Sequence, residues 1–176
     1  MGKISRRDAG KILIAGAAGL MVSRRSALGA AKIDSVVRGV ALGAQSYSFR
    51  DRDLDACIEG YRPVGLGESE LWQGHVEPRK MKGEDRKKWR LETPLSFFED
   101  VRKKFEAAGV HIHAYNYSFR KEMSDEEIDR GFEMAKALGV GIITASANVS
   151  VAARVDKYAA KHKIRVGFHG HDATDK

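Results

Sequence analysis

Apolar and polar positions follow two alternating periods along the chain from Val40 onward. Runs with a period of two predict strands, and runs with apolar residues at i, i+3, i+4 and i+7 predict helices. The predicted strands are 40–49, 67–72, 110–119, 140–147 and 164–171, and the predicted helices are 54–61, 93–108, 124–138 and 151–161. The body of the chain is therefore predicted to alternate five strands with four helices.

Local signals set the helix boundaries. Thr93-Pro94 predicts a helix start with Thr93 as the N-cap and proline in the first position. Ser124 and Glu127 have the spacing of a capping box. Gly109 and Gly139 follow the last apolar positions and are expected to end their helices. The polar segment between the second strand and residue 92 carries no such signal, and we expect a loop there.

Strands that alternate with helices predict parallel pairing and right-handed crossovers, hence an α/β fold. Tyr47-Ser48-Phe49-Arg50 returns as Tyr117-Ser118-Phe119-Arg120, which favours a repeating strand–helix unit. Five such strands fit either an open doubly wound sheet or part of a (β/α) barrel, which usually needs about 250 residues when closed. No glycine-rich phosphate fingerprint follows the first strand, which weakens a nucleotide-binding interpretation but leaves both folds open.

Residues 1–31 have the order of an export signal. A basic start with Arg6-Arg7 precedes an uncharged run over 12–22 and a stretch of small residues over 26–31. The start resembles a twin-arginine signal, with Ala9 and the later pair Arg24-Arg25 as departures from the usual pattern. We expect export to the periplasm and contact with the membrane through this leader alone.

The net charge of +7 belongs mostly to the leader, since residues 1–31 account for +5 of it. Overall basicity therefore gives no support to a nucleic-acid partner. The basic run over 79–90 is interleaved with acidic residues, so we expect a solvated loop over the mouth at the carboxyl ends of the strands, with a phosphorylated ligand as the functional alternative. The single cysteine, Cys57, lies on an apolar helix stripe and is predicted to be a small core residue.

Polar side chains share one face of the predicted strands. Since side chains alternate across a strand, this parity gathers Gln45, Tyr47 and Phe49; Glu68, Glu70 and Trp72; His111, His113, Tyr115 and Tyr117; and His169 with His171. The apolar parity belongs beneath the helices, and the polar one belongs in a barrel lumen and at its C-terminal mouth. Carboxylates and imidazoles that converge there suit proton transfer or divalent-metal binding.

Three segments resemble a known family. Residues 43–49 (GAQSYSF), 65–72 (GLGESELW) and 166–172 (VGFHGHD) are similar to the first, second and fifth strands of xylose isomerase-like TIM-barrel proteins, the sugar phosphate isomerase/epimerase group. Gly170 stands where the family often has asparagine. The resemblance implies that residues 32–176 form a C-terminally truncated part of a (β/α)8 barrel, and that the partner is a sugar or sugar phosphate.

The resemblance also implies roles for individual residues. Glu70, His169 and His171 are the catalytic or substrate-side candidates that it supports. The shared strand face, not the resemblance, makes substrate-binding candidates of Gln45, Tyr47, Trp72, His113 and Tyr115. The family implies a divalent metal, Mn²⁺, Mg²⁺ or Zn²⁺, held mostly by later strands, so no metal ligand is assigned. We expect the truncated chain to be inactive.

Two other functions stay open at this point. One is a non-catalytic sugar-binding barrel or a gene remnant, and the other is a metal-dependent endonuclease or phosphodiesterase of the same barrel superfamily. The sequence leaves the sugar, the metal and the oligomeric state undetermined.

Overall fold

The computed structural model describes residues 30–170. The chain divides into two units, Met1–Ala30 and Ala31–Lys176, and the second carries the fold described below. Nearly all of the expected leader, and His171 of the predicted site, lie outside the described residues. No helix among the described residues is long and apolar enough to cross a membrane.

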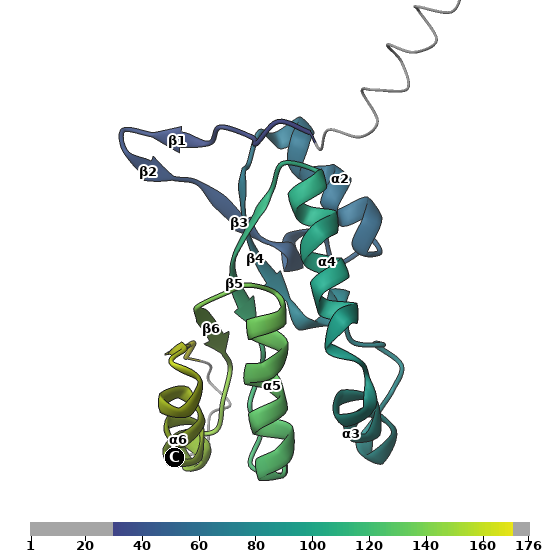
Figure 1. Ribbon diagram of the computed structural model, residues 1–176, viewed down its shortest axis with the longest axis vertical. Helices are drawn as coiled ribbons and strands as arrows, with labels where there is room; N and C mark the ends of the chain where they lie inside the picture. The colour runs from purple at the N-terminus through teal and green to yellow at the C-terminus, as the bar shows by residue number, and fades with distance from the viewer. Residues whose placement is uncertain (1–29, 171–176) are drawn as a thin grey trace, which may run out of the picture. The chain divides into compact units, whose positions relative to one another are not determined.

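Five parallel strands form one sheet in the order in which they occur in the sequence (Figure 1). They are β3 (Gly43–Gln45), β4 (Glu68–Trp72), β5 (His111–Asn116), β6 (Ile142–Ala145) and β7 (Arg165–Phe168). A doubly wound sheet reverses its strand order at a switch point, whereas a (β/α) barrel adds each strand beside the previous one. The sequential order therefore fits a partial TIM-like fold and decides against the open doubly wound alternative.

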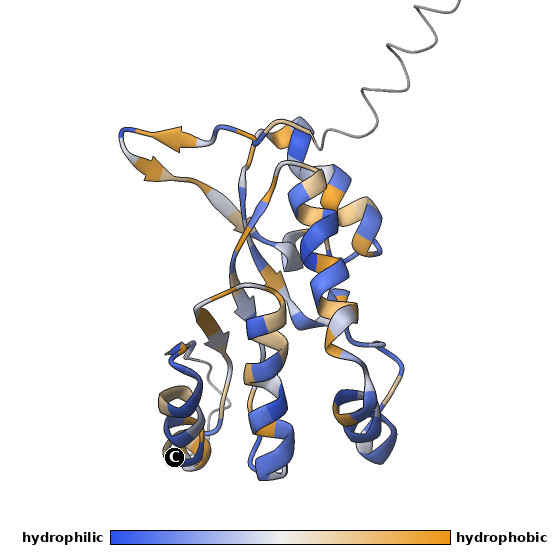
Figure 2. Ribbon diagram, viewed as in Figure 1, coloured by the Kyte–Doolittle hydropathy of each residue, from blue (hydrophilic) through white to orange (hydrophobic). Residues whose placement is uncertain are grey.

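Between residues 30 and 170, five α-helices accompany the sheet: α2 (Leu54–Val64), α3 (Gly83–Glu92), α4 (Leu95–Ala107), α5 (Asp125–Ala137) and α6 (Ala152–His162). Three short 3₁₀ turns lie at Ser46–Phe49 (η1), Gln73–His75 (η2) and Val149–Val151 (η3). Apolar and polar residues alternate along the helices, as the banding in Figure 2 shows. The apolar stripes pack on the sheet and bury large side chains such as Phe98, Phe105, Phe132 and Ile143. Cys57 is fully buried among them, as predicted, and burial raises the pKa of its thiol to about 11.

The first predicted strand is wrong over most of its length. Residues 40–49 divide into the end of a hairpin, the three-residue strand β3 and the turn η1. The hairpin pairs β1 (Val36–Val37) with β2 (Val40–Ala41), and its valines are exposed (Figures 1 and 2). Phe49 leaves the predicted strand face because it packs against Tyr61 of α2, with ring centroids 5.1 Å apart.

The polar segment before residue 93 is not a loop throughout, because it contains α3. This helix carries almost no apolar stripe, so periodicity could not reveal it. Its end also corrects the predicted cap: Thr93 terminates α3, with Oγ1 donating to the Trp89 carbonyl at 2.6 Å, and Pro94 is the N-cap of α4.

The predicted capping box and the two helix-ending glycines are confirmed. The Ser124–Glu127 capping box is complete at the start of α5, with both reciprocal hydrogen bonds present. Gly109 and Gly139 adopt φ values of +77° and +76° after α4 and α5. This left-handed conformation costs glycine little and ends a helix.

A buried ion cluster joins α3 to α5. Arg90 donates from Nε and Nη2 to the two carboxylate oxygens of Glu77, at 2.8 and 2.9 Å, and its Nη1 lies 3.6 Å from Glu127 Oε1. All three side chains are buried, and the guanidinium also lies over the Tyr117 ring. Burial opposes the charged form, but the two carboxylates outweigh it and hold the pKa of Arg90 above its usual value.

We expect Arg90→Met to lower the free energy of unfolding by about 3–5 kcal/mol, because the substitution leaves two buried carboxylates without their cation. Urea unfolding followed by circular dichroism measures this. Lys103→Met is the matched control, since its ion pair with Asp100 is exposed and is worth about 0–1 kcal/mol. Equal losses in the two variants would contradict a structural role for the buried cluster.

Candidate functional site

A cavity of about 770 Å³ opens at the carboxyl ends of the strands, which is the end where barrel enzymes place their chemistry. We call it the mouth cavity. It is lined by Gln45, Tyr47, Glu70, Trp72, Asn116, Ser118, Thr144, Ser146, Gly167, Phe168 and His169. Every strand of the parallel sheet contributes to this lining or is followed directly by a residue that does.

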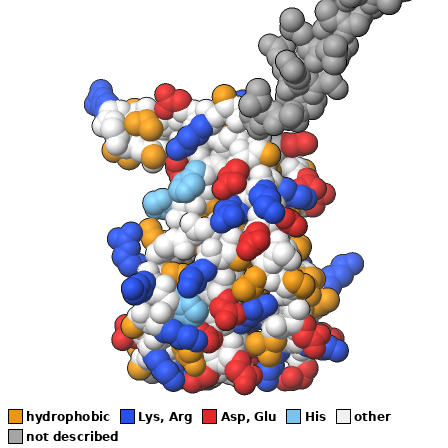
Figure 3. Space-filling view, viewed as in Figure 1, with side chains coloured by type: hydrophobic (Ala, Val, Ile, Leu, Met, Phe, Trp, Pro, Cys, Tyr) orange, Lys and Arg blue, Asp and Glu red, His pale blue; other side chains and the backbone are white. Residues whose placement is uncertain are grey.

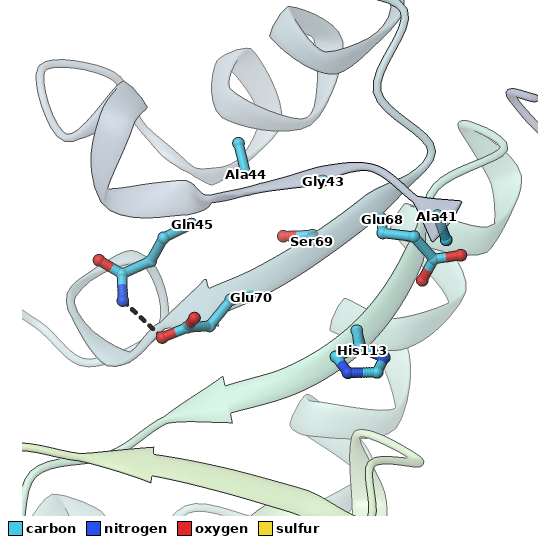
Figure 4. A pocket seen from close by; sticks show the side chains of 8 residues that line it. All are labelled: Ala41, Gly43, Ala44, Gln45, Glu68, Ser69, Glu70 and His113. Carbon is cyan, nitrogen blue, oxygen red and sulfur yellow. Dashed lines mark hydrogen bonds between the residues drawn. The ribbon is translucent and has the colours of Figure 1, made fainter. Parts of the chain in front are cut away.

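Glu70 is at the centre of the hydrogen bonds in this cavity. Its Oε1 accepts from Gln45 Nε2 and from Thr144 Oγ1, each at 2.5 Å (the first is drawn in Figure 4). Asn116 Nδ2 donates to Thr144 Oγ1 at 3.1 Å. These four residues, the inner polar network, come from β3, β4, β5 and β6, and they hold the carboxylate in one orientation.

The contact between Glu70 and Thr144 also reports the curvature of the sheet. The two residues belong to β4 and β6, which are separated by β5. Strands two apart lie about 9–10 Å from each other in a flat sheet. In a barrel, by contrast, side chains from alternate strands meet in layers inside the lumen. A 2.5 Å hydrogen bond across β5 is consistent with this inward curvature.

Two aromatic rings form one wall of the mouth cavity. Tyr47 and Trp72 meet edge to face with centroids 4.9 Å apart. The Arg50 guanidinium lies 4.7 Å from the Tyr47 ring centre, and that of Arg79 lies 5.1 Å from the Trp72 ring centre. The wall therefore combines flat apolar surface with positive charge beside a carboxylate.

The predicted position of Tyr115 is wrong. The pairing of β4 with β5 shifts register between Ser69 and Glu70, so that Ser69 pairs with Ile112 but Glu70 pairs with Ala114. This β-bulge adds one residue to β5 and reverses the parity after it. Tyr115 and Tyr117 consequently lie in the hydrophobic core, fully buried, and Asn116 takes the place in the mouth cavity.

His113 precedes the point at which the side-chain parity of β5 reverses. It faces a smaller pocket and not the mouth cavity, where it was predicted. With Gln45, Glu68 and Glu70 it lines a smaller cavity of about 230 Å³ toward the amino ends of β4 and β5, the amino-end pocket (Figure 4). Of the predicted residues, the mouth cavity thus brings together Gln45, Tyr47, Glu70, Trp72 and His169. His171 lies outside the described residues.

Sequence reasoning missed four polar residues of the mouth cavity, Asn116, Ser118, Thr144 and Ser146. Thr144 and Ser146 could have been found, because they alternate with the apolar residues Ile143, Ala145 and Ala147 of a predicted strand. Asn116 and Ser118 could not, because the bulge that turns them inward has no local sequence signal.

Ser46 and His75 support the aromatic wall from behind. Ser46 Oγ accepts from the Trp72 backbone N–H at 2.8 Å and lies 2.9 Å from His75 Nδ1. His75 Nε2 lies 3.3 Å from the Phe49 carbonyl, and its ring packs edge to face on Trp72. Burial of the imidazole lowers the pKa of His75.

The basic run over 79–90 has its strongest contacts inside the protein. Arg79 donates to the carbonyls of Gly74, Arg50 and Arg52, and Arg90 belongs to the buried ion cluster. These arginines therefore brace the loop after β4 and are not available as a continuous phosphate-binding groove.

The described part of the mouth cavity does not assemble a metal site. Glu70 and His169 line it, but the three side chains whose ligand atoms converge are Glu68, His111 and His113, outside this cavity. Glu70 Oε1 is already used by two hydrogen-bond donors.

No protein-family model matches the chain, and neither does any curated protein. Two solved structures from Parabacteroides distasonis are similar in fold. A protein described as uncharacterized matches with a TM-score of 0.57 and 20% identity over 74% of this chain and 53% of its own. A sugar phosphate isomerase/epimerase matches with a TM-score of 0.52 and 18% identity over 79% and 54%. The chain thus spans about half the length of these structures, and at such identities the likeness shows the fold alone.

The lowered pKa of His75 predicts a pH dependence of stability. The unfolded chain takes up a proton near the usual value of about 6.5, before the folded protein does, so stability falls as the pH drops through that value toward the lower folded pKa. We expect the free energy of unfolding to drop more between pH 7.0 and 5.5 in the wild type than in His75→Gln. Urea unfolding of both proteins across this range measures the difference, and parallel pH profiles would contradict it.

Proposed function

We propose that the chain forms part of a xylose isomerase-like (β/α) barrel that acts on a sugar or sugar phosphate as an isomerase or epimerase. One observation carries the proposal: the Glu70 carboxylate is fixed by Gln45 and Thr144 inside the mouth cavity, beside the aromatic wall of Tyr47 and Trp72. The fold likeness to a sugar phosphate isomerase/epimerase supports it coarsely.

The lining of the mouth cavity suits a polyhydroxylated ligand. Carboxylate, amide and hydroxyl groups of the inner polar network can exchange hydrogen bonds with sugar hydroxyls. The flat rings of Tyr47 and Trp72 offer apolar surface to the C–H face of a sugar. Arg50 lies over the Tyr47 ring and would attract a phosphorylated substrate.

In the proposed reaction Glu70 is the group that exchanges a proton with a sugar carbon, and His169 is a second polar group facing the same space. A proton shift between neighbouring carbons needs an acid and a base on the reacting atoms. The described lining of the mouth cavity supplies this one carboxylate and this one histidine, but it brings no set of metal ligands together. We therefore expect the chain by itself to bind sugar without turnover, and we propose that a divalent metal and further groups complete the reaction in a whole barrel.

Binding tests the proposal directly. Isothermal titration with a panel of ketohexoses, aldohexoses and their phosphates should reveal at least one ligand. Glu70→Gln should weaken its binding about tenfold, as expected for loss of a charged hydrogen-bond acceptor. Glu59→Gln, in an exposed glutamate of α2, is the matched control and should leave the affinity unchanged.

The outcomes separate the possible functions. Failure of every sugar to bind, or equal affinity in Glu70→Gln and the wild type, would overturn the proposal. Binding that is accompanied by no isomerisation in any longer form of the protein would favour the non-catalytic sugar-binding alternative.

We also infer from the sequence of residues 1–31 that the protein is exported to the periplasm. The basic start, the uncharged run and the small residues at its end support this. Intact mass spectrometry of the protein purified from its host should give a mass that lacks the leader. A mass that retains Met1 and the segment after it would contradict cleavage.

A further inference from the structure

Three metal-binding side chains converge at the amino ends of β4 and β5, away from the mouth cavity. Glu68 and His111 are the first residues of these strands and pair directly across them, and His113 is two residues further along β5. One ligand atom from each side chain can be chosen so that all three lie within 4.8 Å of one another. We refer to these residues as the His–Glu cluster.

The cluster is held in place by the backbone and by charge. Glu68 Oε2 lies 2.6 Å from His111 Nδ1, and Lys32 Nζ lies 3.5 Å from Glu68 Oε1. The bulge in β5 comes directly after the pair Ser69–Ile112, so His113 remains on the same face as His111 while Tyr115 turns into the core. Bulges often re-aim side chains in this way at functional sites.

The cluster is also open to a ligand from solvent. The side chain of His111 is 56% exposed and that of Glu68 is 15% exposed. Glu68 and His113 line the amino-end pocket, whose volume of about 230 Å³ leaves room for water or a small anion beside a bound ion (Figure 4). Histidine side chains are visible on the surface in Figure 3. Among the described residues, the His113 imidazole has no side-chain hydrogen-bond partner, so both ring nitrogens are available.

We propose that Glu68, His111 and His113 bind a divalent transition metal, with zinc as the preferred ion. Two imidazoles and one carboxylate form a three-ligand set that suits Zn²⁺ and leaves a fourth position for water. The hard ions Mg²⁺ and Ca²⁺ prefer all-oxygen sites and are disfavoured by two nitrogen ligands.

A metal ion bound to this cluster would link β4 to β5 at the end of the sheet opposite the mouth cavity. The ligands come from two strands that are far apart in the sequence, so the ion stabilises the folded chain over the unfolded one. The site depends on neither Glu70 nor sugar binding, so it stands or falls independently of the proposed function.

Zinc binding to the EDTA-treated full chain is the test, measured by competition with a chromogenic zinc indicator and by thermal unfolding with and without Zn²⁺. We expect uptake of one equivalent in the low micromolar range or tighter, with a rise in the melting temperature. His111→Gln and His113→Gln should each weaken binding at least tenfold, and the double variant should abolish it. Co²⁺ in place of Zn²⁺ should give the visible d–d absorption of a four-coordinate site.

Two controls make the result specific. His162→Gln changes a histidine that pairs with Asp129 in another part of the fold and should leave zinc uptake unchanged. Lys32→Met removes the cation that competes for Glu68 and should tighten binding a few-fold. Circular dichroism in EDTA checks that each variant is folded, and the exposed position of His111 makes His111→Gln the variant least able to disturb the fold. Failure to bind Zn²⁺ below about 100 µM, or undiminished binding in the double variant, would overturn the proposal.

Discussion

The pairing of β4 with β5 shifts register between Ser69 and Glu70. This shift decides which side chains face inward at the amino end of the sheet and which face inward at its carboxyl end. On one side of it, His111 and His113 face the same way as Glu68. On the other side, Asn116 faces inward and contacts Thr144, while Tyr115 and Tyr117 pack beneath the helices. A regular strand would turn the two tyrosines into the lumen and leave the core beneath α5 without its largest side chains.

The tyrosines that the bulge turns outward meet the buried ion cluster. The Tyr117 ring lies under the Arg90 guanidinium, and Arg90 in turn joins Glu77 of the loop after β4 to Glu127 of α5. Such a cluster contributes little net stability compared with apolar packing, but removal of one member leaves charge stranded in the interior. Its structural effect is positional: it fixes the loop that follows Trp72, and so one side of the mouth cavity.

The features that could be predicted from the sequence are those with local causes. The capping box at Ser124, the left-handed glycines and the stripes of α2, α5 and α6 each follow from residues within one or two turns. The alternation of strand and helix, and with it the parallel sheet, follows from periodicity. Glu70 and Trp72 were placed on the inner face correctly because they belong to β4, whose own alternation the bulge in β5 leaves intact. Gln45 belongs to β3, which pairs with β4 in regular register.

The features that could not be predicted have causes distant in the sequence. The bulge arises from how two strands pair, and α3 is fixed by the contacts of Arg90 rather than by an apolar stripe. Tyr47 and Tyr117 occupy equivalent positions in a repeated tetrapeptide, yet one lies at the cavity and the other in the core. The repeat thus indicates similar positions in the chain but not similar surroundings.

The sequential strand order has a consequence for how the chain reaches this structure. Each strand pairs with the next one along the chain, as Gly43 does with Glu68 and Ile142 with Arg165. In the described sheet, no strand pairs with one from a distant part of the sequence. Each pairing therefore closes only a short loop, and the entropic cost of loop closure is divided among several small losses. Such a sheet can grow by one strand and one helix at a time as the chain leaves the ribosome, with β3 at one edge and the newest strand at the other.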